Sequence, residues 1–274
     1  MARALRVRQR VGVGLSSPIN IFDACHKLGV DVLFANLPSM EGMLARTPRA
    51  TIVVSSVRPP GRQAFTCAHE LGHLIFQHAA TVDLKAEGDL EIEEEDEEEY
   101  AANQFAAFFL MPKTAVVGAL KARGIDPADC LSFPLLAVAG WFGVGFMAFI
   151  NHLRFGLQLI GDSRWKALGK QRPAKLRKDF FPSQALPGIH VVDAAWGPVI
   201  VEARTGDGVW FAAKPEGTTL GSVSSYKGGA MVITDTPGTY SVSVPGLGTY
   251  QVRVARQNYE GRAIFRALSE DEGG

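Results

Sequence analysis

Five consecutive residues, His69-Glu70-Leu71-Gly72-His73, constrain this chain more than any other stretch. On an α-helix, residues four apart share a face, so His69 and His73 can reach one metal ion. Glu70 stands beside the first histidine, where its carboxylate can take a proton from a water molecule that the metal activates. The same pattern also fits a core helix whose histidines are satisfied by hydrogen bonds. We therefore predict a metal-binding helix, with a purely structural helix as the alternative.

A metal site of this type needs a third protein ligand and an open position for water. Downstream carboxylates crowd into an acidic run, followed at once by an apolar helix expected from Tyr100 to Met111. Like charges repel, so we expect the middle of the run to be solvated, whereas a carboxylate on the ordered helix lies at a fixed distance from the histidines. This reasoning favours Glu99, with Glu98 and Glu95 as the nearest competitors. The acidic run consists of Glu87, Asp89, Glu91, Glu93, Glu94, Glu95, Asp96, Glu97, Glu98 and Glu99.

Helical geometry also gives expectations for two further polar residues, Asn103 and His78. Asn103 lies one turn beyond Glu99, so its side chain is expected on the same face, where it can steady the Glu99 carboxylate. His78 is nine residues after His69. That separation is about 180° round an ideal helix. His78 is therefore predicted to face away from the ion and to be dispensable for metal binding.

A second motif follows the histidine motif: residues 99–112 spell E-x-x-A-N-x-F-A-A-x-x-L-M-P. In this order the two motifs resemble the ImmA/IrrE family of metallo-endopeptidases. The family's metal-binding glutamate stands thirteen residues before the proline of the second motif, the position of Glu99 before Pro112. The resemblance covers roughly residues 1–160 and implies a zincin-like helical metallopeptidase domain with a small sheet. It also implies a divalent metal, most simply Zn2+, although two histidines and a carboxylate do not exclude Mn2+.

The resemblance further implies a reaction and a class of substrate. Glu70 would be the general base in the hydrolysis of a peptide bond. The substrate would be a DNA-bound transcriptional repressor, often of the helix-turn-helix type, whose cleavage relieves repression in a stress response or a mobile-element switch. Two alternatives stay open: a DNA-binding regulator with an inert or structural metal site, and a membrane-associated metalloprotease. The sequence does not indicate the oligomeric state.

The stretch from Leu131 to Ile150 holds twenty largely apolar residues. Its length alone would suit a transmembrane helix. However, Pro134, Gly140 and Gly143 interrupt it, so we predict two shorter packed helices with Gly143 in the turn, a pair that resembles a helix-turn-helix. The second helix offers few polar or basic side chains to bases and phosphates. We therefore expect neither direct DNA binding nor membrane insertion.

The predicted fold class is α+β, in three segments. Residues 1–160 form the metallopeptidase domain, with short strands expected near 30–34 and 50–54 and with the helical pair at its end. Residues 161–187 are rich in lysine, arginine and proline and are predicted to be a basic linker. Residues 188–268 contain short β-rich runs separated by turn residues, which indicates a small β-rich C-terminal domain of the sandwich or barrel type.

Cysteine usage and the N-terminal segment bear on location. The three cysteines, Cys25, Cys67 and Cys130, are odd in number and contain no C-x-x-C pair, so we expect thiols in a reducing cytoplasm. The N-terminal residues include no apolar run of the kind found in a secretory signal. The formal net charge is zero, although ten of the 28 acidic residues fall in the acidic run. We therefore expect a cytoplasmic protein with a local concentration of negative charge near the site.

Overall fold

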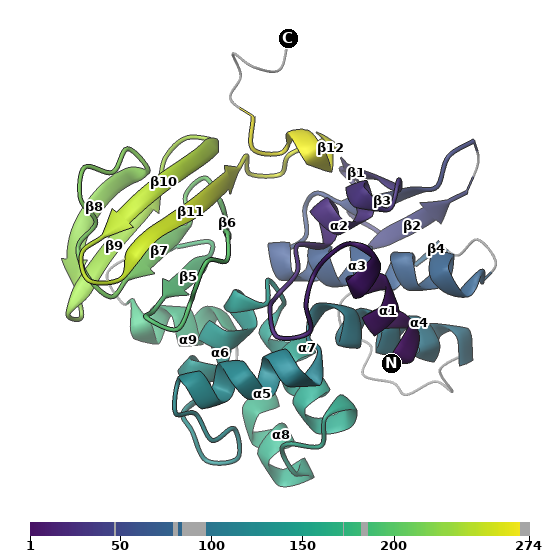
Figure 1. Cartoon of the computed structure of the whole chain (residues 1–274), viewed down its shortest axis with the longest axis horizontal. Helices are drawn as coiled ribbons and strands as arrows, with labels where there is room; N and C mark the ends of the chain where they lie inside the picture. The colour runs from purple at the N-terminus through teal and green to yellow at the C-terminus, as the bar shows by residue number, and fades with distance from the viewer. Residues whose placement is uncertain (47, 79–81, 84–96, 172, 182–185, 269–274) are drawn as a thin grey trace. The chain divides into compact units, whose positions relative to one another are not determined.

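The chain folds into two compact units, each containing helices and strands (Figure 1). The computed structural model describes all residues except 47, 79–81, 84–96, 172, 182–185 and 269–274. The predicted α+β class is confirmed in coarse form, with a helical N-terminal region around a small sheet and a β-rich C-terminal part. Unit 1 consists of Met1–Gly118, Phe142–Gln158 and Asn258–Ile264, and unit 2 of Ala119–Trp141, Leu159–Gln257 and Phe265–Gly274.

Unit 1 contains a five-stranded mixed sheet in the order β12-β1-β3-β2-β4. Strands β1 (Asp31–Ala35) and β3 (Thr51–Ser55) are the two that the β-branched runs predicted, and they pair in parallel. Alternate residues of β3 point into the core, where Ile52 and Val54 are fully buried. The other strands, β2 (Gly42–Ala45), β4 (Val82–Asp83) and β12 (Gly261–Arg262), pair antiparallel with their neighbours.

Two long helices of unit 1, α3 (Pro60–Phe76) and α4 (Glu97–Leu110), pack closely against each other. Gly72 makes this approach possible, because a Cβ at that position would lie 3.1 Å from Cα and 3.2 Å from the carbonyl oxygen of Ala102. Phe105 and Phe109 fill the adjacent core with stacked rings. The helices that complete unit 1 are α1 (Ala2–Arg10), α2 (Ile21–Lys27), the first part of α5 (Lys113–Ala122), α7 (Phe146–Asn151) and the π-helix η1 (His152–Gly156).

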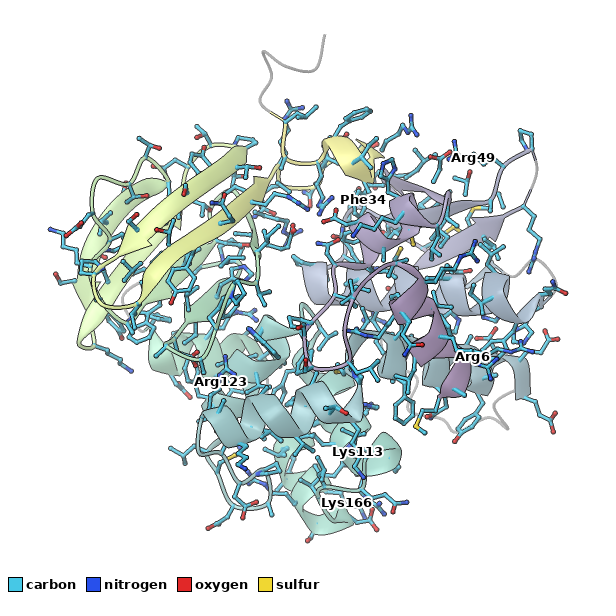
Figure 2. All side chains as sticks on the ribbon, in the orientation of Figure 1. Arg6, Phe34, Arg49, Lys113, Arg123 and Lys166 are labelled. Carbon is cyan, nitrogen blue, oxygen red and sulfur yellow. The ribbon has the colours of Figure 1, made fainter. Side chains whose placement is uncertain are left out.

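A C-terminal segment belongs to unit 1, which the sequence did not predict. Strand β12 pairs antiparallel with β1, with Gly261 opposite Phe34 and Arg262 opposite Leu33. The guanidinium of Arg262 lies 2.8 Å from the Asp31 carboxylate, and the Phe34 ring, labelled in Figure 2, meets the Tyr259 ring edge-on. Residues 258–264, assigned from the sequence to the C-terminal domain, therefore complete one edge of the N-terminal sheet.

The apolar stretch from Leu131 to Ile150 is broken as predicted. Helix α6 (Ser132–Trp141) ends before Gly143, which has a φ of 67°, and α7 starts at Phe146. Among the described residues, no single helix is long and apolar enough to cross a membrane, although two pairs of helices joined at a bend pass the same test together. The boundary between the units falls at this break, so α6 belongs to unit 2 and α7 to unit 1.

The segment predicted to be a basic linker contains two helices, α8 (Asp162–Gly169) and α9 (Pro173–Phe180). Each buries a leucine, Leu168 and Leu176, in unit 2. The guanidinium of Arg164 donates to the carbonyl oxygens of Pro127 and Cys130. The basic residues of this segment therefore lie on folded helices, because the apolar residues between the charges anchor α8 and α9.

Unit 2 also contains two small mixed sheets, ordered β10-β11-β6 and β5-β7-β9-β8. The rings of Phe211 and Tyr250, one from each sheet, lie 6.1 Å apart. The sequence missed β8 (Gly221–Tyr226) because it is an edge strand with mostly exposed, serine-rich positions. The remaining strands are β5 (Ile189–Val192), β6 (Val201–Arg204), β7 (Gly208–Phe211), β9 (Gly229–Thr234), β10 (Gly238–Val244) and β11 (Gly248–Ala255), and the 3-10 helix η2 spans Ala263–Phe265.

Candidate metal centre

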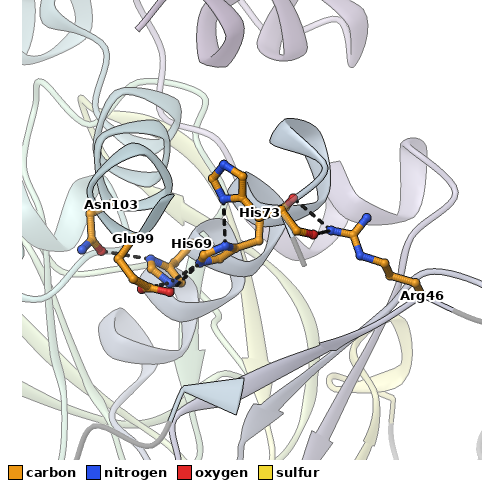
Figure 3. Close-up of polar contacts among 6 residues, drawn as sticks. Arg46, His69, His73, Glu99 and Asn103 are labelled. Carbon is orange, nitrogen blue, oxygen red and sulfur yellow. Dashed lines mark hydrogen bonds and ion pairs between the residues drawn. The ribbon is translucent and has the colours of Figure 1, made fainter. Parts of the chain in front are cut away.

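Helices α3 and α4 bring His69, His73 and Glu99 together, as the sequence predicted (Figure 3). The two Nε2 atoms of the histidines lie 2.9 Å apart. The Glu99 carboxylate lies 3.2 Å from Nε2 of His69 and 3.4 Å from Nε2 of His73. His73 is fully buried and His69 is 5% exposed, whereas the Glu99 side chain is 29% exposed. The cluster is therefore enclosed on the α3 side and accessible on the α4 side.

The donor atoms fit a divalent metal both in type and in spacing. Imidazole nitrogen and carboxylate oxygen are common zinc ligands, and a tetrahedral ion with ligands at roughly 2.0–2.1 Å keeps neighbouring ligand atoms about 3.3 Å apart. The three distances in the cluster, 2.9, 3.2 and 3.4 Å, scatter around that value. Three protein ligands leave one position open, as in catalytic rather than structural zinc sites.

Asn103 lies beside the cluster and contacts His69. Its Oδ1 is 2.9 Å from Nδ1 of His69. If Nδ1 of His69 donates its hydrogen to this oxygen, Nε2 of the same ring keeps its lone pair for a metal. Helical periodicity predicted Asn103 on the face of Glu99, whereas the contact with the ring of His69 depends on the packing of α4 against α3.

Glu70 is fully buried on the same helix. A Cβ added at Gly42 of β2 would lie 3.8 Å from its Cγ, so this side chain lies near strand β2. The same Cβ would clash at 2.6 Å with Thr66. Strand β2 thus passes close to the side chain of Glu70, the residue predicted to be the general base.

The acidic run contributes one of its described residues to the cluster. Glu97 and Glu98 are exposed in the first turn of α4, and among the described residues only Glu99 joins the two histidines. Glu98 was a predicted competitor and lies outside the cluster. Glu95, the other competitor, and the rest of the run up to Asp96 lie outside the described residues.

Two residues near the cluster were missed by the sequence analysis, His78 and Arg46. His78 places Nδ1 3.0 Å from Nδ1 of His73, although helical geometry had turned it away from the site. That geometry does not apply, because α3 ends at Phe76 and Gln77 takes a left-handed conformation with a φ of 63°. Arg46 donates to the backbone carbonyl oxygens of His73 and His78 (Figure 3). A glycine or asparagine in place of Gln77 would have signalled such a helix end.

The cysteines take no part in the cluster. Cys25, Cys67 and Cys130 are all free thiols, in agreement with the prediction. The buried sulfur of Cys67 lies 3.9 Å from that of Cys25 on α2, which places it in the core between the two helices.

Comparison with known proteins adds one finding. The family model for the M78 peptidases, described as the IrrE N-terminal-like domain, matches residues 25–154. That range contains both helices of the cluster and every residue predicted for the site. A comparison with curated proteins gives no match.

Proposed function

We propose that this chain, which belongs through residues 25–154 to the M78 peptidase family of IrrE N-terminal-like domains, is a zinc-dependent endopeptidase. The observation that carries the proposal is the convergence of His69, His73 and Glu99 at distances suited to a divalent ion. The zincin-like class of the N-terminal region and the assignment of zinc rather than manganese are parts of this proposal. The donor set supports both metals.

His69, His73 and Glu99 would hold the ion in the proposed mechanism. A bound divalent cation supplies Lewis acidity toward the scissile carbonyl and makes water a better nucleophile near neutral pH. Glu70 takes a proton from the attacking water on its carboxylate and passes it to the nitrogen of the departing amine. Glu70 is fully buried and its side chain lies near Gly42 of β2, so the proposal places the substrate on the side of that strand. Asn103 orients the ring of His69 through the 2.9 Å contact at Nδ1.

We propose a DNA-bound transcriptional repressor as the substrate, with cleavage in the cytoplasm relieving repression. The resemblance to ImmA/IrrE proteins supports this choice. The structure makes direct DNA reading by α7 and η1 a poorer candidate, because His152 is 3% exposed and its Nε2 donates to the carbonyl oxygen of Met111. A repressor encoded beside this chain would be the first substrate to test.

The decisive experiment compares wild type with Glu70→Gln on such a repressor. The variant should bind as much zinc as wild type, because the three ligand side chains are intact, and should lose turnover, because the base is absent. Metal content is measured by elemental analysis and cleavage by mass spectrometry of the products. Normal cleavage by Glu70→Gln would reject the proposed base. A wild-type protein that binds no divalent metal would reject the peptidase assignment altogether.

A further inference from the structure

The strongest unassigned feature of the site is the chain reversal that ends helix α3. The backbone N–H of His78 donates to the carbonyl oxygen of His73 at 3.0 Å, and that of Gln77 donates to Leu74 at 3.2 Å. With Gln77 left-handed, this pair of bonds is a Schellman motif. The reversal brings His78 back beside the helix, on the side of His73.

The side chain of His78 is then held by two contacts. Its ring stacks on Phe76, with centroids 5.3 Å apart and planes 11° from parallel. Its Nδ1 lies 3.0 Å from Nδ1 of His73. The stacking fixes the plane of the ring, and the contact at Nδ1 gives its orientation within that plane.

Arg46, just beyond strand β2, fixes the reversal from outside. Its guanidinium donates to the carbonyl oxygens of both His73 and His78 at the C-terminal end of α3 (Figure 3). A cation at this position also interacts favourably with the negative end of the helix dipole. The location of His78 is thus determined by β2 as well as by α3.

Two nitrogens 3.0 Å apart share one hydrogen, so one ring donates and the other accepts. Nε2 of His73 faces Nε2 of His69 and the Glu99 carboxylate. For this Nε2 to bind a cation it must be unprotonated, and the hydrogen of the neutral ring must then be on Nδ1. His73 is therefore the donor in the pair, and Nδ1 of His78 is the acceptor.

We propose that His78 is a positioning residue for His73: it accepts the Nδ1 hydrogen and so keeps Nε2 of His73 unprotonated and directed at the metal. The pair is the counterpart of Asn103 and His69, in which an amide oxygen occupies the same position relative to the ring. Partners of this kind fix the tautomer and orientation of ligand histidines. The inference rests on the proposed function to the extent that His73 is a ligand.

The test uses two substitutions at one position. His78→Asn retains an acceptor, because the asparagine Oδ1 is attached to Cγ as Nδ1 is in histidine, whereas His78→Leu has similar bulk and no acceptor. Zinc affinity is measured by competition with a chromogenic chelator. We expect His78→Leu to bind zinc roughly 10–100-fold more weakly, and His78→Asn to stay close to wild type. His26→Leu, at an exposed position of α2, is the matched control and should not change the affinity.

A second measurement does not depend on zinc or on catalysis. The 15N chemical shifts of the His73 ring in metal-free wild type report which nitrogen carries the hydrogen, and we expect it on Nδ1. A hydrogen on Nε2 would overturn the inference even if the protein binds zinc. Equal zinc affinity in wild type and His78→Leu would overturn it as well, as would equal losses in the leucine and asparagine variants. If wild type bound no zinc, the peptidase assignment would fail, and the shifts of His73 would still decide the role of His78.

Discussion

The buried imidazole of His152 predicts a specific dependence of stability on pH. The ring is 3% exposed, lies edge-on to Phe108 and donates from Nε2 to the carbonyl oxygen of Met111 at 2.9 Å. Gly156 leaves the space that Nδ1 occupies, since a Cβ there would lie 2.3 Å from it. Desolvation lowers the pKa of His152 from 6.5 to about 4, although the bond to Met111 opposes part of the shift.

The sign and size of the effect follow from these two pKa values. Between pH 6.5 and 4 the unfolded chain binds a proton at His152 and the folded chain does not. The contribution of His152 to stability is therefore fully present above pH 6.5 and is lost as the pH falls toward 4. A shift of one unit corresponds to about 1.4 kcal/mol, so the contribution of His152 to the free energy of unfolding amounts to about 3 kcal/mol at the acid end.

The assay is urea unfolding of metal-free wild type and His152→Gln at pH 7 and pH 4.5. Glutamine places an amide N–H near the position of Nε2 and does not titrate. All four tryptophans lie in unit 2, so circular dichroism is the better probe of unit 1. Between pH 7 and pH 4.5, the free energy of unfolding should fall by about 2–3 kcal/mol more in wild type than in His152→Gln. Equal losses in the two proteins would refute the assignment of a buried neutral imidazole.

Three further predictions concern the metal cluster. Glu99→Gln should lower zinc affinity severely even though Glu97 and Glu98 remain. Competition with a chelator measures this affinity, and an unchanged value would mean that another residue is the third ligand. Asn103→Leu should weaken zinc binding roughly 10–100-fold, whereas Asn103→Asp, which keeps an acceptor oxygen, should weaken it less in the same assay. Gly72→Ala should lower the melting temperature, because overpacking costs about 1–3 kcal/mol. It should also lower the zinc affinity, because a shift of α4 moves Glu99 away from the histidines. A variant with the melting temperature and zinc affinity of wild type would contradict the close approach of the two helices.

The sequence by itself determined the features that depend on short-range periodicity. His69 and His73 share a face because they are one helical turn apart, and Asn103 shares a face with Glu99 for the same reason. The break of the apolar stretch at Gly143 and the strands β1 and β3 were likewise predictable from local patterns. In each case the hydrogen bonds or the pattern of burial repeat within a few residues, so the local sequence carries the information.

Only the tertiary structure decided which of these local elements meet, and at what distance. The approach of α4 to α3 depends on the missing Cβ of Gly72. The return of β12 to β1 pairs Gly261 and Arg262 with residues more than 200 positions earlier in the chain. His78 shows the limit most clearly. A helical wheel turned it away from the metal, but the left-handed Gln77 reverses the chain and Arg46 fixes the reversal from another element. Periodicity extends only as far as the helix does, and the residue at which α3 ends is set by contacts with the rest of unit 1.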